Sequence, residues 1–263
     1  MVAGRLVACL VLYQTSMNTD PTISAVDARA AARIALRDEP RVAPATSTVR
    51  FFDSELLVFP GVRFPLRSML VESPTKAILV SPVGTRAELV AVDGKPCVIA
   101  EPSLLHYKRL AQSIQKLAPR ELWGPPGFAE KLPEFSDASV FGADPWPHDD
   151  LLSFTLIEGA PFRNEIVFFH RASRTLYTAD LVFGIVQPSG ILTPLVLRAL
   201  GIGRTFGAAK LWSHWIKDPA AFRRSIDRVM GWPFDRIAMA HGEIVEGNAR
   251  AKLFGALRER GLI

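Results

Sequence analysis

The sequence predicts an α/β fold in which helices cover the outside of mixed β-sheets. Three short strands joined by tight turns open the folded part of the chain, which indicates an antiparallel start. Strands then alternate with helical segments in both halves of the remaining chain, a pattern typical of layered α/β folds. The chain has 263 residues, enough to bury a large core, and we expect one domain preceded by a tail.

Residues 1–50 are expected to form a flexible leader outside the folded domain. Residues 18–50 are rich in Ala, Arg, Asp and Pro, with a candidate helix at Ala25–Leu36. Met1–Gln14 holds a short apolar core of signal-peptide type, but no small-x-small cleavage site follows it. We interpret this weak signal-like segment as an upstream extension with Met17 as the true start; secretion is the alternative.

Composition indicates the cellular compartment and the classes of partner to expect. The two cysteines, Cys9 and Cys97, are too few for a disulfide framework, and no C-x-x-C motif occurs, which favours a cytoplasmic protein. No apolar segment reaches the about 20 residues that a membrane-spanning helix requires. The formal charge of +5 comes from scattered residues, whereas nucleic-acid binding requires clustering, so we expect no nucleic-acid partner.

The first half of the folded domain, which we expect to span residues 51–263, contains strands, turns and two helices. The dipeptides Pro60-Gly61 and Ser73-Pro74 mark turns, and a longer helix follows where leucine and isoleucine recur near helical spacing. The expected elements are strands at Phe51–Phe59, Leu66–Val71 and Lys76–Ser81, a short helix at Ala87–Val92, a strand at Cys97–Ala100 and a helix at Ser103–Leu117.

The second half repeats this style around a long insert. Residues 186–232 are interrupted by Pro and Gly and are expected to form a mainly helical insert. No repeat of fixed period occurs, which argues against solenoids and propellers. The remaining expected elements are strands at Leu151–Ile157, Ile166–Phe169, Thr175–Asp180 and Ile237–Ala240, and a closing helix at Ala249–Arg260.

Two of these strands deliver a polar side chain at their ends. Thr175–Asp180 ends in a carboxylate, and the strand at Ile237–Ala240 is followed directly by His241 and Gly242. A strand end is rigid, and a polar residue there projects into a cleft while the strand stays buried. Asp180 and His241 are therefore the leading site residues. The structural alternatives are a turn-capping aspartate and a buried histidine bonded to backbone.

The order of elements resembles the metallo-β-lactamase fold. An early hairpin, an apolar strand that opens a helix, a later hairpin ending in Asp and a final strand ending in His-Gly carry the resemblance from Phe51 to the C-terminus. The motifs at 102–106 (PSLLH), 159–170 (GAPFRNEIVFFH) and 178–183 (TADLVF) look like a bacterial branch of that superfamily with a degenerate metal-binding motif. The resemblance implies a four-layer αββα sandwich of two mixed β-sheets flanked by helices.

The family's hallmark, H-x-H-x-D-H, binds two adjacent metal ions, and here most of it is missing. The resemblance places Pro102 and Leu104 at the first two histidines, His106 at the aspartate and Tyr107 at the last histidine. A further family histidine, expected near Pro161, is also absent. Asp180 and His241 match the bridging carboxylate and the final histidine.

The resemblance therefore implies at most one divalent metal ion, held by His106, Asp180 and His241. Two imidazoles and a carboxylate with an open position suit zinc best, and iron or manganese are alternatives. A chain that binds no metal is the remaining alternative. Near the missing histidine, Arg163 and Asn164, together with Tyr107, are candidate substrate-binding residues.

The three other histidines are not expected to be metal ligands. His170 lies in the expected hairpin turn and should be exposed, and His148 lies in a proline-rich loop where solvated residues are common. His214 lies between two tryptophans and lines either a pocket or a helix interface.

The leading functional hypothesis is a metal-dependent hydrolase that acts on a small-molecule ester, lactone or phosphoester. The absence of a G-x-S-x-G elbow and of a phosphate-binding glycine loop argues against serine hydrolases and P-loop proteins. A member of the fold that has lost catalysis and serves as a binding or interaction module is the alternative. An oxidoreductase with an iron-loaded site is a third hypothesis.

Overall fold

The computed structural model describes residues 47–202 and 205–263. The predictions for Met1–Gln14 and Ala25–Leu36 lie outside these residues. The first strand begins at Thr48, three residues before the expected start at Phe51. No helix within the described ranges is long and apolar enough to cross a membrane.

The first sheet has six strands in the order β1-β2-β3-β4-β5-β6. The opening three strands pair antiparallel, as the sequence predicts, and β3 to β6 then pair parallel. Helical segments connect the parallel strands, as parallel pairing requires. The strands are β1 (Thr48–Phe59), β2 (Val62–Glu72), β3 (Ala77–Val80), β4 (Cys97–Ala100), β5 (Glu121–Gly124) and β6 (Ser139–Val140).

The second sheet has five strands in the order β11-β10-β9-β8-β7. Three pairs of consecutive strands are antiparallel, β7–β8, β8–β9 and β10–β11, whereas β9 and β10 pair parallel inside the sheet. The strands are β7 (Ser153–Leu156), β8 (Ile166–His170), β9 (Thr175–Thr178), β10 (Arg236–Met239) and β11 (Val245–Glu246).

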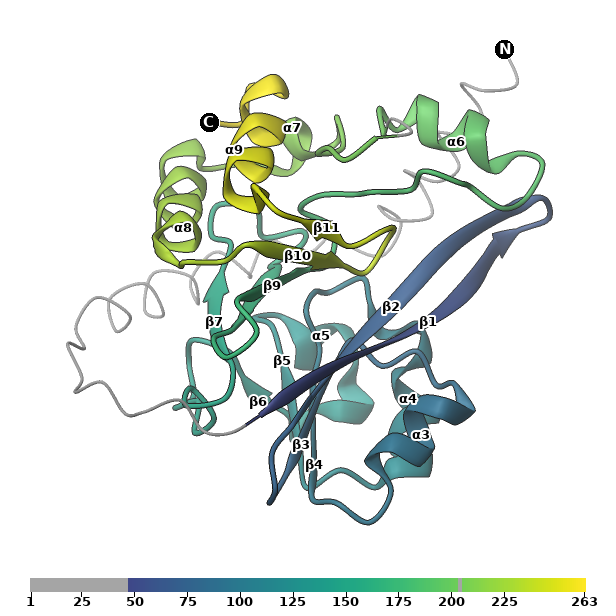
Figure 1. Cartoon of the computed structure of the whole chain (residues 1–263), viewed down its shortest axis with the longest axis vertical. Coiled ribbons are helices and arrows are strands. Elements are labelled where there is room, and N and C mark those ends of the chain that lie inside the picture. The colour runs from purple at the N-terminus through teal and green to yellow at the C-terminus, as the bar shows by residue number, and fades with distance from the viewer. Residues whose placement is uncertain (1–46, 203–204) are drawn as a thin grey trace.

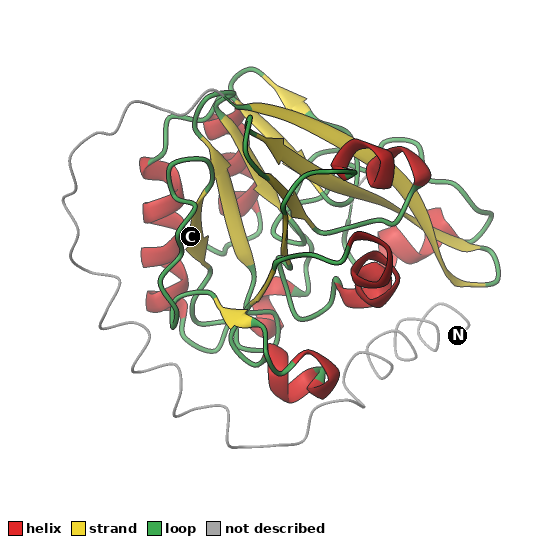
Figure 2. Ribbon diagram, turned by 90° about the horizontal axis from the view of Figure 1, so that it is seen from below, coloured by secondary structure: helices red, strands yellow, loops and turns green. Residues whose placement is uncertain are grey.

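Apolar side chains alternate between the two faces of each sheet and so build three separate cores. In β8, Phe168 packs between the sheets while Phe169 packs against the outer helices. In β3, Val80 faces the other sheet while Leu79 faces outward into a third cluster. Both faces of both sheets are therefore buried, and helices cover the outsides (Figures 1 and 2). This confirms the four-layer αββα sandwich.

The outer helices divide between the two sheets. Helices α3 (Arg86–Val92), α4 (Leu110–Leu117) and α5 (Phe128–Lys131) contribute to the cluster on the outside of the first sheet. Helices α8 (Pro219–Gly231) and α9 (Ala249–Glu259) contribute to the cluster on the second sheet. Helices α6 (Thr193–Ala199) and α7 (Trp212–Trp215) lie in the insert (Figure 1).

The helix expected at Ser103–Leu117 is shorter than predicted. Helix α4 begins only at Leu110, after the 3₁₀ turn η2 (Tyr107–Arg109), and a second such turn, η3 (Pro133–Phe135), follows α5. The reason is long-range: the amide of Leu104 donates to the carbonyl of Arg163 at 3.1 Å. The loop after β4 is thus hydrogen-bonded to the segment before β8 and cannot close its own helical turns there.

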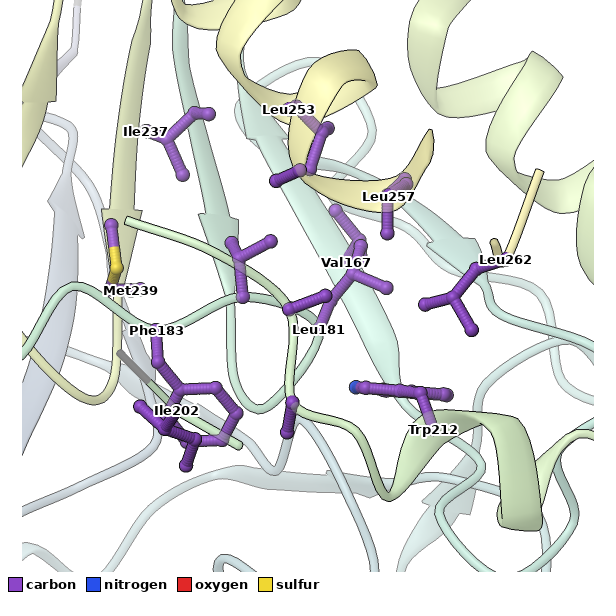
Figure 3. Packing of buried hydrophobic residues seen from close by; sticks show 14 of the residues in the cluster. Val167, Leu181, Phe183, Ile202, Trp212, Ile237, Met239, Leu253, Leu257 and Leu262 are labelled. Carbon is purple, nitrogen blue, oxygen red and sulfur yellow. The ribbon is translucent and has the colours of Figure 1, made fainter. Parts of the chain in front are cut away.

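The insert is anchored in the core of the second sheet. Trp212 is fully buried beside Leu181, Val167 and residues of α9 (Figure 3). Its indole Nε1 donates to the backbone oxygen of Asp180 at 2.8 Å. Burial of an indole with its donor satisfied is strongly stabilising, so the insert packs as part of the domain.

Gly242 marks a close approach of two backbones just after β10. Gly184 and Gly242 form an isolated parallel bridge, and φ of Gly242 is 127°. A Cβ at this position would lie 2.2 Å from the backbone carbon of Gly184. Only glycine fits both the backbone angle and the space.

We predict that Gly242→Ala destabilises the protein by about 2–4 kcal/mol, because backbone overlap and a disfavoured φ both oppose alanine. Gly255→Ala is the matched control, since a Cβ on Gly255 in α9 meets nothing within 4 Å and alanine favours a helix. Urea unfolding of both variants measures the difference. Equal stability of the two variants would contradict the argument.

The half of the chain that forms the first sheet contains two buried carboxyl groups, those of Glu88 and Glu101. Glu88 accepts hydrogen bonds from the amides of Val83 and Gly84 at 3.0 and 2.6 Å. Glu101 is fully buried, and neither of its carboxyl oxygens has a hydrogen-bond partner among the described residues. Burial, and then the nearby Glu88 carboxyl, raises the pKa of Glu101 well above its ordinary value. Glu101 is therefore held in its neutral form.

We predict that Glu101→Gln gains stability relative to the parent chain as pH rises above about 4.5. The raised pKa means that the folded parent holds a proton that the unfolded chain releases, so its stability falls with pH up to the folded-state pKa. Glutamine does not titrate, so the variant lacks this loss. The difference in unfolding free energy between variant and parent should therefore change by up to about 1.4 kcal/mol per pH unit. Denaturant unfolding of both chains at pH 5 and pH 8 tests the prediction. A difference in stability that is the same at both pH values would refute it.

Candidate metal centre

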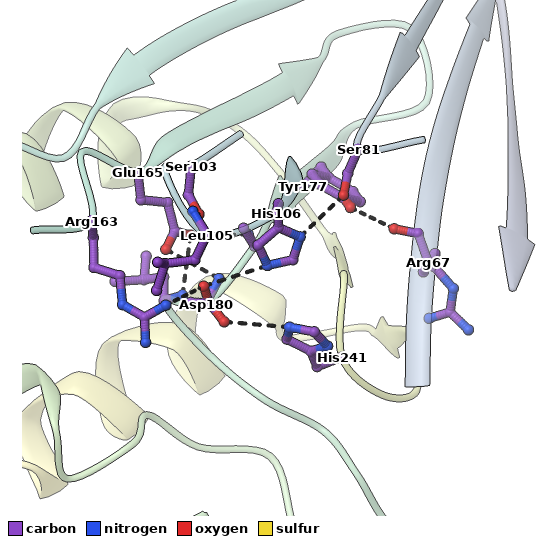
Figure 4. Close-up of polar contacts among 12 residues, drawn as sticks. Arg67, Ser81, Ser103, Leu105, His106, Arg163, Glu165, Tyr177, Asp180 and His241 are labelled. Carbon is purple, nitrogen blue, oxygen red and sulfur yellow. Dashed lines mark hydrogen bonds and ion pairs between the residues drawn. The ribbon is translucent and has the colours of Figure 1, made fainter. Parts of the chain in front are cut away.

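The pairing of β9 with β10 brings Asp180 and His241 together. The two strands are parallel, and Thr178 is opposite Met239. Asp180 and His241 each follow two residues later, so they leave the same edge of the sheet as neighbours. His106 reaches this edge from the other sheet, on the loop after β4 (Figure 4).

The three side chains converge closely enough to share one ion. His106 Nε2 lies 3.4 Å from Asp180 Oδ2, and His241 Nε2 lies 3.3 Å from Asp180 Oδ1. One potential ligand atom from each residue lies within 4.8 Å of the others. The side chains are 5%, 7% and 10% exposed for His106, Asp180 and His241, so water shields the cluster only weakly.

The hydrogen bond of His241 fixes which nitrogen faces Asp180 as an acceptor. Nδ1 lies 2.7 Å from the carbonyl oxygen of Pro65, and a carbonyl only accepts, so Nδ1 carries a proton. In the neutral ring, Nε2 then directs a lone pair at the Asp180 carboxylate. Either a proton on Nε2 or a metal ion between these atoms removes the repulsion. Backbone acceptors orient metal-binding histidines in this manner.

Aromatic rings hold the His241 imidazole in place. The Phe183 ring stacks on it at a centroid distance of 5.5 Å, and the Phe64 ring meets it edge-on at 5.9 Å. The His106 ring lies 5.0 Å away, and its Nδ1 contacts the Ser81 hydroxyl at 3.1 Å. Burial lowers the pKa of His106, although Asp180 opposes the shift. This favours the neutral ring that a metal ligand requires.

Arg163 is the permanent cation of the cluster. Its Nη1 donates to Asp180 Oδ2 at 2.6 Å, and its guanidinium lies 3.7 Å from the centre of the Trp215 ring. Burial alone would raise the pKa of Asp180, but the Arg163 guanidinium, followed by His106, holds it well below its usual range. Asp180 is therefore ionised, with one oxygen bound by Arg163.

Glu165 fixes the turn that carries Asp180. Its carboxylate accepts the amides of Ala179, Asp180 and Leu181 at 2.9, 3.1 and 3.1 Å. Burial, and then the Asp180 carboxylate, raises the pKa of Glu165 to about 8, against the effect of these donors and of Arg163. Sequence reasoning missed this role. The available signal was a glutamate placed directly before the apolar run Ile166–Phe169.

A cavity of about 270 Å³ opens onto the cluster. Tyr107 and Arg163 line it together with the three candidate metal ligands. Asn164 is not among the residues that line it: Asn164 is buried, with φ of 42°, and its side-chain amide donates to the Pro126 carbonyl at 2.9 Å, so its role in substrate binding stays a prediction. Its amide is used to join two loops.

The remaining histidines do not belong to this centre. His170 is fully buried, not exposed, because Ser47 and Ser173 hydroxyls lie 2.9 and 2.7 Å from its two ring nitrogens. His148 is also buried, between Lys76 and Glu121. His214 is exposed. Sequence reasoning failed for the first two because their partners are distant in the chain.

Comparison with known proteins identifies the fold. No family sequence model and no curated protein matches the chain. The metallo-β-lactamase from Erythrobacter litoralis matches 84% of this chain and 99% of its own at 16% identity, with a TM-score of 0.54. DIM-1 metallo-β-lactamase matches the same shares at 12% identity and a TM-score of 0.55.

A third similar structure is not named as a β-lactamase. The flavodiiron core of Flv1 from Synechocystis sp. PCC6803 matches 81% of this chain and 59% of its own, at 14% identity and a TM-score of 0.55. The αββα layers and the strand-end cluster define the class, and the chain has the metallo-β-lactamase fold.

We predict that Glu165→Gln destabilises the protein by about 2–4 kcal/mol, because an amide cannot accept all three backbone donors. Glu246→Gln is the control: the Glu246 side chain is 65% exposed and pairs with Arg236 at 2.9 Å, and its loss should cost less than about 1 kcal/mol. Urea unfolding measures both. A Glu165 variant as stable as the control would contradict the assigned role.

Proposed function

We propose that the chain is a hydrolase-like enzyme that uses one divalent metal ion, zinc in the first instance, held by His106, Asp180 and His241. The substrate is a small-molecule ester, lactone or phosphoester. The observation that carries the proposal is the orientation of His241, whose Nδ1 is committed to Pro65 while Nε2 faces Asp180 Oδ1 at 3.3 Å. That position attracts a cation.

The donor set fits one ion and not two. His106 Nε2, His241 Nε2 and one oxygen of Asp180 are available, whereas Arg163 already binds Oδ2. In the resemblance to the family, Pro102 and Leu104 replace a histidine pair, and neither side chain supplies a metal ligand. A guanidinium beside Asp180 also repels a second cation. These features support a mononuclear site.

A bound divalent ion supplies a Lewis acid that polarises a substrate oxygen and lowers the pKa of water. The chain's own residues do the rest. Glu165 and Trp212 hold the Asp180 turn, and Pro65 fixes the tautomer of His241. Phe183 and Phe64 exclude water from the His241 ring. Arg163 provides a fixed positive charge for an anionic group of the substrate.

A binding module without catalysis is the second candidate, and one observation favours it. Arg163 alone already neutralises Asp180 at 2.6 Å, so the cluster is electrostatically balanced without a metal ion. In that case the cavity binds a ligand, and no bond is broken in it.

Metal analysis separates the two candidates. We predict about one zinc ion per chain after dialysis against zinc, and a clear loss in Asp180→Asn and His241→Ala. Zinc at a hundred times its dissociation constant should raise the unfolding free energy by about 2.7 kcal/mol, and a chelator should remove this gain. His148→Ala is the control, since His148 is buried 2.9 Å from Glu121 in another cluster.

Each outcome distinguishes the metal-dependent enzyme from the binding module. Stability that ignores zinc and chelator would eliminate the metal-dependent proposal and leave the binding module. Zinc binding followed by hydrolysis of chromogenic esters or phosphoesters, lost in Asp180→Asn, would establish the enzyme. Iron recovered from the purified protein would redirect the proposal to redox chemistry.

A further inference from the structure

The cavity beside the candidate metal centre carries an excess of positive charge, of which the proposed chemistry uses only Arg163. Four cationic side chains line it, those of Lys108, Arg109, Lys131 and Arg163. The one carboxylate in the lining is Asp180, and Arg163 binds it directly. The lining therefore has an excess of positive charge at a partly buried position.

Lys131 is the clearest sign of this excess. Within residues 47–202 and 205–263, no carboxylate lies within ion-pair distance of its ammonium group. Burial, and then Arg163 and Lys108, lowers its pKa to about 8. The ammonium groups of Lys131 and Lys108 each lie 5.2 Å from the centre of the Tyr107 ring. Arg109 and Arg163 each have a buried Nε without a hydrogen-bond partner among the described residues. An anion would satisfy these groups.

Much of the remaining lining is apolar. One apolar wall is formed by Val58, Phe64 and Leu66 of the opening hairpin and by Leu200 and Ile202 after α6. The Phe64 ring contacts His241, so this wall begins at the metal centre. Figure 4 shows Arg163 on one side of Asp180 and the strand that carries Arg67 on the other. The three candidate metal ligands therefore lie between a cationic side and an apolar side.

We propose that the ligand of this cavity is an anionic amphiphile, with a carboxylate or phosphate at Arg109, Lys131 and Arg163 and a hydrocarbon chain along the hairpin wall. The cavity has a volume of about 270 Å³, which is many times the space that one water molecule needs. A chain of medium length, near eight carbons, fits this space.

As a substrate, such a molecule carries an ester or phosphoester bond between its anionic head and its hydrocarbon tail, beside His106, Asp180 and His241. Water adds to the acyl or phosphoryl centre, the bond to the leaving oxygen breaks, and that oxygen takes a proton to give an alcohol and an acid. This assignment as substrate rests on the proposed function. Binding of the amphiphile does not, because the cationic and apolar walls need no metal ion.

Calorimetry with simple probes tests the proposal on the full chain, both as purified and after removal of metal by chelator. Octanoate and octyl phosphate should bind at least roughly tenfold more tightly than acetate, inorganic phosphate or octanol, which each lack the tail or the charge. The two octyl probes distinguish a carboxylate head from a phosphate head.

Variants locate the two ends of the ligand. Lys131→Met should weaken octanoate binding roughly tenfold and Lys131→Arg should restore it, because only the charge is needed. Val58→Asp places a charge in the tail wall and should weaken octanoate but not acetate. Lys116→Met is the control, since Lys116 is exposed on α4 and does not line the cavity. Thermal unfolding checks that each variant is folded.

Binding should also weaken as pH rises through about 8, where Lys131 loses its proton, and this dependence should vanish in Lys131→Met. Octanoate that binds no better than acetate and octanol, or equally to Lys131→Met and Lys116→Met, would overturn the inference. If the amphiphile binds to protein that takes up no zinc, the inference stands and the enzymatic proposal fails. If zinc binds and octanoate does not, the inference about the ligand fails and the proposed metal site stands.

Discussion

The parallel pairing of β9 with β10 is the constraint on which the site depends. Its register places Asp180 and His241 side by side at one edge of the second sheet. Shifting that register by one residue would turn Leu176 and Ile237 out of the core and separate the two side chains. The hydrophobic core therefore fixes the distance between carboxylate and imidazole. Gly242 then lets the chain leave the strand against the backbone of Gly184.

The buried cluster is an electrostatic unit as well as a geometric one. Asp180 is ionised far from water, which costs free energy unless cations surround it. Arg163 provides one such cation, and a proton or metal ion between His241 and Asp180 provides another. Glu165 holds the turn through three backbone amides. The chain thus has a fixed cation, Arg163, at one oxygen of the buried carboxylate, and this keeps Asp180 oriented.

The sequence predicts those parts of the structure that depend on local patterns. Apolar runs with turn residues indicate the strands, and polar residues at their ends single out Asp180 and His241. His106 needed the family resemblance, because its loop is bonded to Arg163 and Pro102 is bonded to Ile166, contacts between distant residues. The exposure of His170 was wrongly predicted for the same reason: Ser47, whose hydroxyl contacts its ring, lies far from it in the chain. Lys131 gave no signal in the sequence, since only the packing of α5 beside Tyr107 brings it to the cavity.

A metal ion and an anionic ligand should favour each other in this cavity. Arg163 already offsets Asp180, so a divalent ion adds charge to a lining that contains Lys108, Arg109 and Lys131. Like charges in a partly buried site oppose that addition. An anion bound at the same lining removes part of the repulsion and in turn gains attraction from the metal ion. Linkage requires the two effects to be equal in binding free energy. On the proposed function, the anionic ligand would supply negative charge that the lining, with Asp180 as its one carboxylate, does not.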